Sequence, residues 1–228
     1  MNDIHNGKNK IKILLAEDHV MVREGTRRIL EREEDFEVVG EASDGVEAVR
    51  LVNELQPDVA VVDIAMPNLN GIEATKQIKS LRPATAVLIV SAYDNDQYIF
   101  AVLEAGAAGY LLKNARTKEL IEAIRAVHAG ESVLHPVVAR KVVNRFAALA
   151  ARPGDAKPSE PLSDREIEIL KLAAKGLSNQ EIAERLVLSV RTIQSHLGRI
   201  FNKLQVGSRT EAVLHSLKRG WITIDDLP

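Results

Sequence analysis

The stretch Val59-Ala60-Val61-Val62-Asp63 is a short apolar run that ends on an acidic residue, and Ile64-Ala65-Met66-Pro67 and Gly71 follow it. A near-continuous run of β-branched side chains is typical of a strand buried on both faces, as in a parallel sheet. The proline four residues beyond Asp63, with Gly71, gives the following loop a defined shape. The stretch therefore predicts a buried strand that carries Asp63 into a structured loop at its carboxyl end.

Four more apolar runs of similar length lie on either side of this strand. They are IKILLA (11–16), FEVVGEA (36–42), AVLIVSA (86–92) and AGYLL (108–112). Amphipathic segments with helical spacing separate the runs, near 20–33, 45–55, 71–81, 95–105 and 116–129. Strands that alternate with helices indicate a doubly wound α/β domain with a five-stranded parallel sheet. We assign this domain, of the flavodoxin-like type, to residues 11–130.

The second half of the chain has almost no strand signal. Residues 136–149 have the pattern of a helix, and 150–162 contain three prolines and a glycine, so we predict a linker over 131–160. Ser-x-x-Glu boxes then begin at Ser163, Ser178 and Ser208, each able to cap a helix start reciprocally, and Ser189 is a fourth start without the glutamate. These starts predict an all-α, four-helix domain over 161–228, with helices near 164–175, 179–186, 190–204 and 209–219.

Composition limits the class of protein. The chain has 228 residues, 46% hydrophobic and 27% charged, and no cysteine, which excludes disulfides and thiolate metal sites. The first ten residues are polar and are expected to be disordered, and the apolar runs are far shorter than a membrane span. Residues 1–130 hold 15 basic against 21 acidic residues, whereas the rest is mildly basic. We expect a cytoplasmic protein without a membrane segment.

Polar side chains end four of the predicted strands. In an open parallel sheet, ligands bind beyond the carboxyl ends of the strands, where the strand order reverses. The side chains that would meet there are Glu17, Asp18, Asp63, Ser91 and Lys113. Each of them alone is also consistent with a turn, capping or solvated residue, so the prediction depends on their convergence.

Together these residues have the chemistry of a site that binds Mg²⁺ and accepts a phosphoryl group. Mg²⁺ prefers oxygen ligands, which Asp18, Asp63 and backbone near Ala65 would supply. An aspartate carboxylate can act as a nucleophile toward phosphorus. Lys113 and the metal ion would offset charge on the transferring phosphoryl oxygens, and Ser91 could donate a hydrogen bond to the product.

The segment 178–204 predicts a helix-turn-helix. On its second helix a core stripe consists of Ile193, Leu197, Ile200, Phe201 and Leu204. The opposite face carries Arg191, Thr192, Gln194, Ser195, Arg199, Asn202 and Lys203. Basic side chains with amide and hydroxyl neighbours suit phosphate contacts and base reading in a major groove, although a solvated face of an interaction module has the same pattern. Gly198 within this helix suggests close approach of a neighbouring helix or of DNA.

The first domain resembles the response-regulator receiver family. The resemblance covers about 11–130 and is carried by EDH (17–19), VVDIAMPNLNGIE (61–73), VSAY (90–93) and GAAGYLLK (106–113). It implies that Asp63 accepts a phosphoryl group, that Glu17 and Asp18 complete a Mg²⁺ site, and that Lys113 contacts the phosphoryl. It also implies that Ser91 follows the phosphoryl and that Tyr110 is a switch aromatic. Glu17 stands where aspartate is also common in the family, and Asn70 where aspartate is frequent.

Residues 161–219 resemble the LuxR-type helix-turn-helix of the NarL/FixJ subfamily, on LSDREIEILKLAAKGLSNQEIAERLVLSVRTIQSHLGRIFNKLQVGSRTEAV. That family usually has lysine where this chain has Gln194, which affects the preferred DNA sequence. The family's fourth helix, here 209–219, often mediates dimerisation. The two resemblances together imply a two-component response regulator that a histidine kinase phosphorylates, that pairs as a homodimer on phosphorylation, and that binds double-stranded DNA.

Two other functions are consistent with parts of the sequence. One is an α/β phosphotransferase or phosphatase that uses an aspartyl intermediate on external substrates, but no insertion is long enough for a substrate lid. The other is a constitutive DNA-binding protein whose first domain only binds other proteins. The complete set of Glu17, Asp18, Asp63, Ser91 and Lys113 argues against it. We therefore expect a regulator and not an enzyme, apart from Mg²⁺-dependent phosphorylation of its own aspartate.

Overall fold

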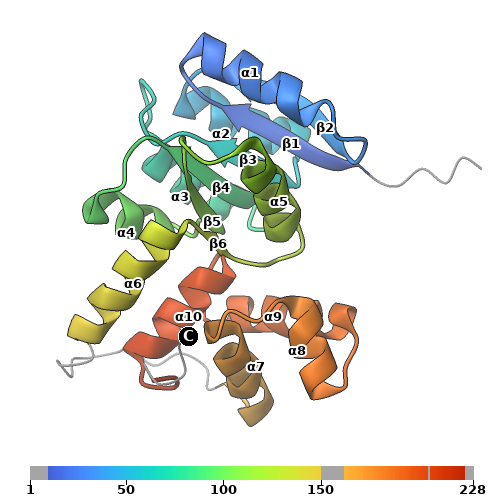
Figure 1. The fold of residues 1–228 in the computed structure, drawn as a ribbon, viewed down its shortest axis with the longest axis vertical. Coiled ribbons are helices and arrows are strands. Elements are labelled where there is room, and N and C mark those ends of the chain that lie inside the picture. The colour runs from blue at the N-terminus through green and yellow to red at the C-terminus, as the bar shows by residue number, and fades with distance from the viewer. Residues whose placement is uncertain (1–9, 150–161, 205, 224–228) are drawn as a thin grey trace, which may run out of the picture.

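The computed structural model describes residues 10–149, 162–204 and 206–223, without the side chains of 143–149 and 218. Its first domain is built on one parallel sheet with the strand order β2-β1-β3-β4-β5-β6 (Figure 1). The strands are β1 (Ile11–Ala16), β2 (Phe36–Ala42), β3 (Val59–Val62), β4 (Ala86–Ser91), β5 (Gly109–Leu112) and β6 (Val133–Leu134). The order reverses between β1 and β3, which places a crevice at their carboxyl ends. No helix within the described residues is long and apolar enough to cross a membrane.

Helices cover both faces of this sheet. They are α1 (Val20–Leu30), α2 (Gly45–Leu55), α3 (Gly71–Leu81), α4 (Asp96–Glu104) and α5 (Thr117–His128). Alternate strand residues face opposite sides: Leu14 and Val62 pack with α2, α3 and α4, whereas Leu15 and Val61 pack with α1 and α5. Burial on both faces explains why the strands lack polar alternation, and the predicted doubly wound fold is confirmed.

The sheet has six strands, not the five that the sequence predicted. The additional strand β6 pairs with the edge strand β5, Gly109 with Val133 and Tyr110 with Leu134. It lies within the segment 131–160 that we had assigned to a linker. A two-residue strand is too short to give a periodic signal, which is why the pattern missed it. The predicted helix is present as α6 (Pro136–Leu149), whereas the disordered start and the proline-rich linker fall on 1–9 and 150–161, outside the described residues.

The second domain contains α7 (Asp164–Ala174), α8 (Asn179–Leu186), α9 (Val190–Leu204) and α10 (Arg209–Lys218). Ser163 and Ser178 form the predicted reciprocal capping boxes with the glutamates three residues on. Ser208 also caps its helix, but Glu211 accepts from the backbone N–H of Gly207 and not from Ser208. At the fourth start, the Ser189 hydroxyl accepts from the N–H of Thr192. Local capping thus fixes where all four helices begin.

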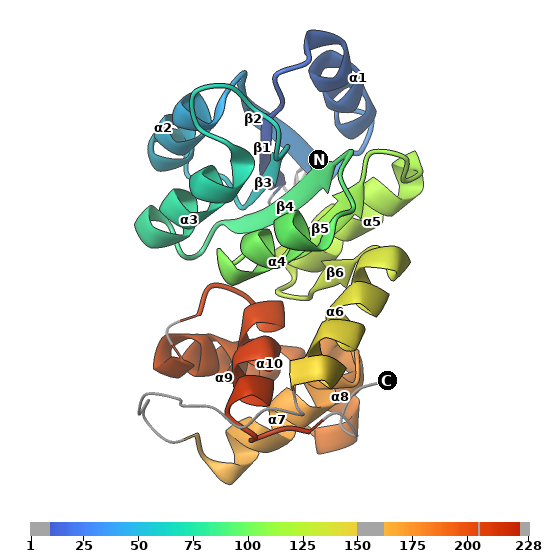
Figure 2. The same ribbon diagram turned by 90° about the vertical axis from the view of Figure 1, so that its left-hand side faces the viewer.

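The two domains share part of their apolar core. Leu214 of α10 belongs to the same buried cluster as Phe100 of α4 and Val138 of α6, with Leu217 packed against it. Figure 2 shows α10 below α4 and beside α6. The second domain therefore packs on the α4 face of the first domain, and α6 borders this contact.

Gly71 allows α3 to begin directly against the strand that carries Asp63. The side chain of Asn70 caps α3 by accepting from the N–H groups of Ile72 and Glu73, both at 3.0 Å. A Cβ atom on Gly71 would lie 2.1 Å from the carbonyl oxygen of Asp63, far inside any real contact. The close approach fixes the loop between Asp63 and Asn70.

We expect Gly71→Ala to lower the free energy of unfolding by about 2–3 kcal/mol, because backbone must move to admit the methyl group. The matched control is Gly25→Ala, since Gly25 is exposed within α1 and its Cβ would meet nothing within 4 Å. That control should raise stability by up to about 1 kcal/mol through helix propensity. Urea denaturation of both variants measures the difference, and equal stability of the two would contradict this account of the loop.

Candidate functional site

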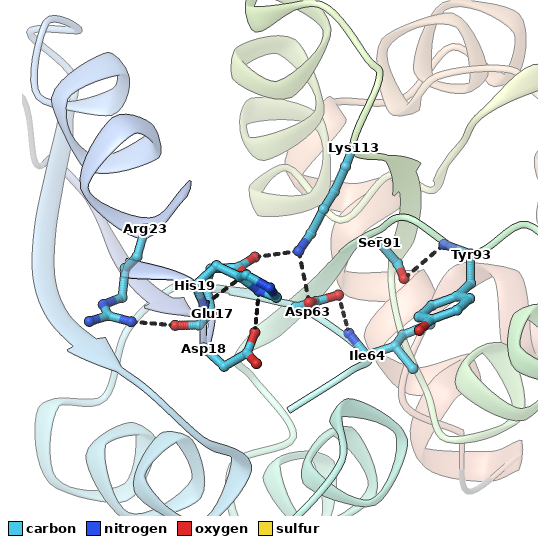
Figure 3. A network of polar contacts seen from close by, with 9 residues as sticks. All are labelled: Glu17, Asp18, His19, Arg23, Asp63, Ile64, Ser91, Tyr93 and Lys113. Carbon is cyan, nitrogen blue, oxygen red and sulfur yellow. Dashed lines mark hydrogen bonds and ion pairs between the residues drawn. The ribbon is translucent and has the colours of Figure 1, made fainter. Parts of the chain in front are cut away.

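Asp63 lies at the carboxyl end of β3 and is 3% exposed. One carboxylate oxygen accepts from the backbone N–H of Ile64 at 2.7 Å, and the other is 2.8 Å from Nζ of Lys113. The same Nζ lies 2.7 Å from a carboxylate oxygen of Glu17 (Figure 3). Burial lowers the pKa of Lys113, but the hydrogen bonds and charges of Asp63 and Glu17 outweigh it and raise the pKa above its usual value. One ammonium group therefore compensates two carboxylates.

Asp18 is the acidic residue of the site that Lys113 does not neutralise. Its carboxylate is 2.7 Å from Nδ1 of His19, and the same Nδ1 is 3.1 Å from Glu17. The hydrogen bond to Asp18, and then the one to Glu17, raises the pKa of His19 above its usual value. His19 itself is an exposed residue at the start of α1.

Ser91 and Tyr110 form the side of the site next to α4. Ser91 is fully buried, and its hydroxyl accepts from the N–H of Tyr93 at 3.3 Å. The phenol of Tyr110 donates to the carbonyl oxygen of Tyr93 at 2.7 Å. Burial raises the pKa of Tyr110 to about 12, and the hydrogen bond with Ser91 opposes the shift. Both predicted switch residues therefore hold the same backbone segment, at Tyr93.

The predicted metal ligands lie at one edge of the sheet. Ligand atoms of Glu17, Asp18 and His19 lie within 4.8 Å of one another. Asp63 is joined to this group through Lys113, and Ala65 is exposed in the loop two residues after Asp63. Carboxylate oxygens at a partly open edge are a donor set that suits Mg²⁺.

The predicted DNA-facing residues of α9 differ in their surroundings. Five of the seven are exposed: Arg191, Gln194, Ser195, Arg199 and Asn202. The side chain of Gln194 also bonds to the other domain. Thr192 is half-buried, and its hydroxyl lies 2.8 Å from that of Ser189. A Cβ on Gly198 would meet nothing within 4 Å, so no neighbouring helix accounts for this glycine.

Lys203 is bound within the domain. Its Nζ lies 2.8 Å from Glu166, which is 5% exposed at the start of α7. Burial raises the pKa of Glu166, but the bonds to Lys203 and Ser163 outweigh it and lower the pKa below its usual value. Lys203 therefore ties α9 to α7.

Sequence reasoning missed several contacts of the site. The guanidinium of Arg23 donates to the carbonyl oxygen of Glu17 at 2.5 Å. Asn179 and Arg209 are 2% and 5% exposed where the two domains meet, and Asn179 bonds to the carbonyl oxygen of Ala129. An arginine five residues after Asp18 on an amphipathic helix was a usable signal for the first contact. No pattern in the sequence links residues 50 positions apart across two domains.

Comparison with known proteins identifies the class. Residues 13–125 match the family model of the response regulator receiver domain, and residues 160–216 match that of the bacterial regulatory proteins of the luxR family. The fold, the acidic site and these matches together define a transcription regulator of a two-component system. The chain belongs to the response-regulator family with a LuxR-type DNA-binding domain, as the resemblance predicted.

Relatives match over nearly the whole length. The chain is 39% identical to the transcriptional regulatory protein DegU of Brevibacillus brevis, over 98% of this chain and 100% of that protein. It is 42% identical to the oxygen regulatory protein NreC of Staphylococcus carnosus, over 92% and 98%. Among solved structures, the response regulator ChrA of a heme-sensing two-component system is 39% identical over 94% of this chain and all of that one, with a TM-score of 0.52. A structure of two RcsB dimers bound to two parallel DNAs is 28% identical over 91% and 98%, with a TM-score of 0.55.

We expect Asp18→Ala to weaken binding of Mg²⁺ about tenfold or more without unfolding the domain. Asp18 is the one carboxylate of the described site that is free of Lys113, so its loss removes a ligand and leaves the ion pairs of Glu17 and Asp63 in place. Calorimetric titration with Mg²⁺ measures the change, and circular dichroism checks the fold. Glu24→Gln, an equal loss of charge on exposed α1, is the control and should bind the ion like the parent. Unchanged affinity in Asp18→Ala would place the metal site elsewhere.

Proposed function

We propose that a histidine kinase phosphorylates Asp63 and that the modification controls sequence-specific DNA binding by α9. The observation that carries the proposal is the buried Asp63 carboxylate held by Lys113 and the Ile64 N–H. Those two donors would bind the phosphoryl oxygens once the group is transferred. The chain acts in the cytoplasm, the compartment that holds the DNA of the bacteria from which its relatives come.

The transfer is a substitution at phosphorus. A carboxylate oxygen of Asp63 forms the new P–O bond as the P–N bond to the kinase's histidine breaks, and the imidazole leaves with the bonding electrons. Glu17, Asp18 and Asp63, with backbone near Ala65, would hold Mg²⁺, which when bound neutralises charge on the phosphoryl oxygens. The ammonium group of Lys113 would exchange its contact with the Asp63 carboxylate for one with a neighbouring phosphoryl oxygen. The hydrogen bond from the N–H of Ile64 fixes the carboxylate's orientation.

Ser91 and Tyr110 would transmit the modification. A phosphoryl group on Asp63 offers a new acceptor to the Ser91 hydroxyl, which now accepts from Tyr93. A shift of the Tyr93 segment changes the start of α4, whose face is covered by Leu214 of α10. Phosphorylation would thereby release α10 and the DNA-binding domain from the receiver and favour homodimerisation.

Two copies on adjacent half-sites follow from the small size of one helix-turn-helix. A single module buries too little surface for tight binding, and a symmetric pair about one helical turn apart doubles the contacts. RcsB, a relative, was solved as dimers bound to DNA. Arg191, Thr192, Gln194, Ser195, Arg199 and Asn202 are the residues that we assign to the DNA-facing surface. Lys203 could contact DNA only after its ion pair with Glu166 breaks.

We expect one phosphoryl group per chain after incubation with acetyl phosphate and Mg²⁺, and none in Asp63→Asn. Intact-mass spectrometry measures the incorporation. Asp58→Asn is the control. Asp58 lies just before β3, at the end opposite Asp63, and its carboxylate accepts from the N–H of Lys12. Undiminished labelling of Asp63→Asn would move the site, continuous release of phosphate would favour a phosphatase, and no labelling of the parent would favour a constitutive DNA-binding protein.

We expect Arg199→Gln to flatten the salt dependence of DNA binding, and Lys203→Gln to leave it unchanged. If Arg191 and Arg199 neutralise about four phosphates per dimer, log affinity should fall with log salt at a slope of roughly −4, and each arginine removed from both subunits reduces it by nearly 2. Lys203→Gln should instead lower the free energy of unfolding by about 1–3 kcal/mol, because it leaves Glu166 buried without its cation.

Binding titrations of the phosphorylated chain at several salt concentrations, on specific and scrambled duplexes, measure the slopes. Urea denaturation measures the stability of the two variants. A slope that responds to Lys203→Gln and not to Arg199→Gln would reverse the assignment. Affinity that is insensitive to salt in every variant would exclude α9 as the DNA-binding helix.

A further inference from the structure

The turn between α5 and β6 of the receiver contacts the DNA-binding domain at the first residue of α8. The backbone N–H of Asn179 donates to a carboxylate oxygen of Glu131 at 3.2 Å. The side-chain amide of Asn179 donates to the carbonyl oxygen of Ala129 at 2.9 Å. An anionic group of the receiver is therefore already seated at the start of this helix, where backbone N–H groups and the helix dipole favour negative charge.

Arg209 fixes the orientation of the Asn179 side chain. One of its guanidinium nitrogens donates to the Asn179 amide oxygen at 3.1 Å, and another donates to carbonyl oxygens of Ala173, at 3.2 Å, and Leu177. Because arginine offers donors alone, the amide oxygen must face it and the NH₂ group must face the receiver. Burial lowers the pKa of Arg209 to about 10, which the negative charges of Glu131 and Glu181 oppose.

The second helix of the motif points a donor at the same atom. The side-chain amide of Gln194 on α9 donates to the carbonyl oxygen of Ala129 at 3.3 Å. Two helices of the helix-turn-helix thus converge on one acceptor, and a carboxylate stands two residues further along. A row of acceptor oxygens with a negative charge is what a DNA backbone presents to such a motif, whose first helix crosses the backbone.

We propose that the turn Ala129–Glu131 imitates a DNA phosphate, and that Asn179 binds a backbone phosphate when the turn leaves. The inference rests on the proposed function, which it extends by a phosphate contact outside the face of α9 described above. When the turn leaves, the side-chain amide of Gln194 also loses the carbonyl oxygen of Ala129 as its acceptor and becomes available to DNA. Since the turn and the duplex use the same donors, each excludes the other, and the charge of Glu131 strengthens the closed arrangement.

The first test uses Glu131→Gln in the full-length chain. Loss of the carboxylate charge should raise the DNA affinity of the unphosphorylated chain about fivefold, because a charge-assisted contact of the closed arrangement becomes a neutral one. The phosphorylated chain should bind as the parent does. Glu122→Gln is the matched control, since Glu122 is an exposed glutamate of α5 whose described ion pair is with Lys118 on the same helix. Equal effects of the two substitutions would overturn the proposal.

The second test uses Asn179→Ala in the phosphorylated chain. Affinity should fall about fivefold or more on specific and scrambled duplexes alike, because a phosphate contact carries no sequence information. The salt slope should stay unchanged, because asparagine is neutral. A loss confined to the specific duplex would mean that Asn179 reads a base and would overturn the proposal.

Asn179→Asp provides the second variant in case the alanine substitution unfolds the domain. It keeps the side-chain shape and gains an ion pair with Arg209, but presents a negative oxygen where the phosphate would bind. It should bind both duplexes more weakly still, and affinity equal to the parent's would refute the contact. Another outcome is that phosphorylation raises the DNA affinity of the parent while the Glu131 and Asn179 variants bind DNA as the parent does. That result would refute the imitation of a phosphate by the turn and leave the proposed function intact. If the phosphorylated parent does not bind DNA, the proposed function itself fails.

Discussion

The ion pairs of Lys113 with Glu17 and Asp63 hold the carboxyl edge of the receiver sheet together. Three strands end at this point, and β1 and β3 each deliver a carboxylate that is almost removed from solvent. Without a cation between them the two negative charges would repel each other in a medium where water screens poorly. The parallel sheet positions these three side chains, since β5 brings Lys113 to the edge where β1 and β3 bring the two carboxylates. The chemistry of the site follows from that placement. A phosphoryl group on Asp63 would change the charge balance at the edge where β1, β3 and β5 end.

A short chain of contacts connects this site to the second domain. Ser91 and Tyr110 both hold the backbone of Tyr93, and the next residue, Asp94, accepts through its carbonyl from Lys141 of α6. Lys141 also pairs with Asp96 at 3.2 Å. Since α6 borders the contact between α4 and α10, the Tyr93–Asp94 segment beside the site is connected directly to the surface that carries the DNA-binding domain.

The sequence predicted the sheet domain well because burial on both faces leaves an unbroken apolar run for each strand. It predicted the convergence of Glu17, Asp63 and Lys113 because strand ends in a parallel fold share one edge. It missed features that are short, or that join residues distant in the chain. The strand β6 has two residues and no period, and a helical pattern cannot show that Glu166 lies 2.8 Å from Lys203 on another helix.

The hydrogen bonds described between the domains, which the sequence did not predict, are individually weak. They join Asn179 and Gln194 to Ala129 and Glu131, and each such bond contributes about 1 kcal/mol net. Coupling between two sites in one protein is typically about 1–3 kcal/mol. Hydrogen bonds of this strength lie within the reach of one phosphoryl group, whereas the apolar packing of Leu214 against α4 and α6 supplies the rest of the contact between the domains.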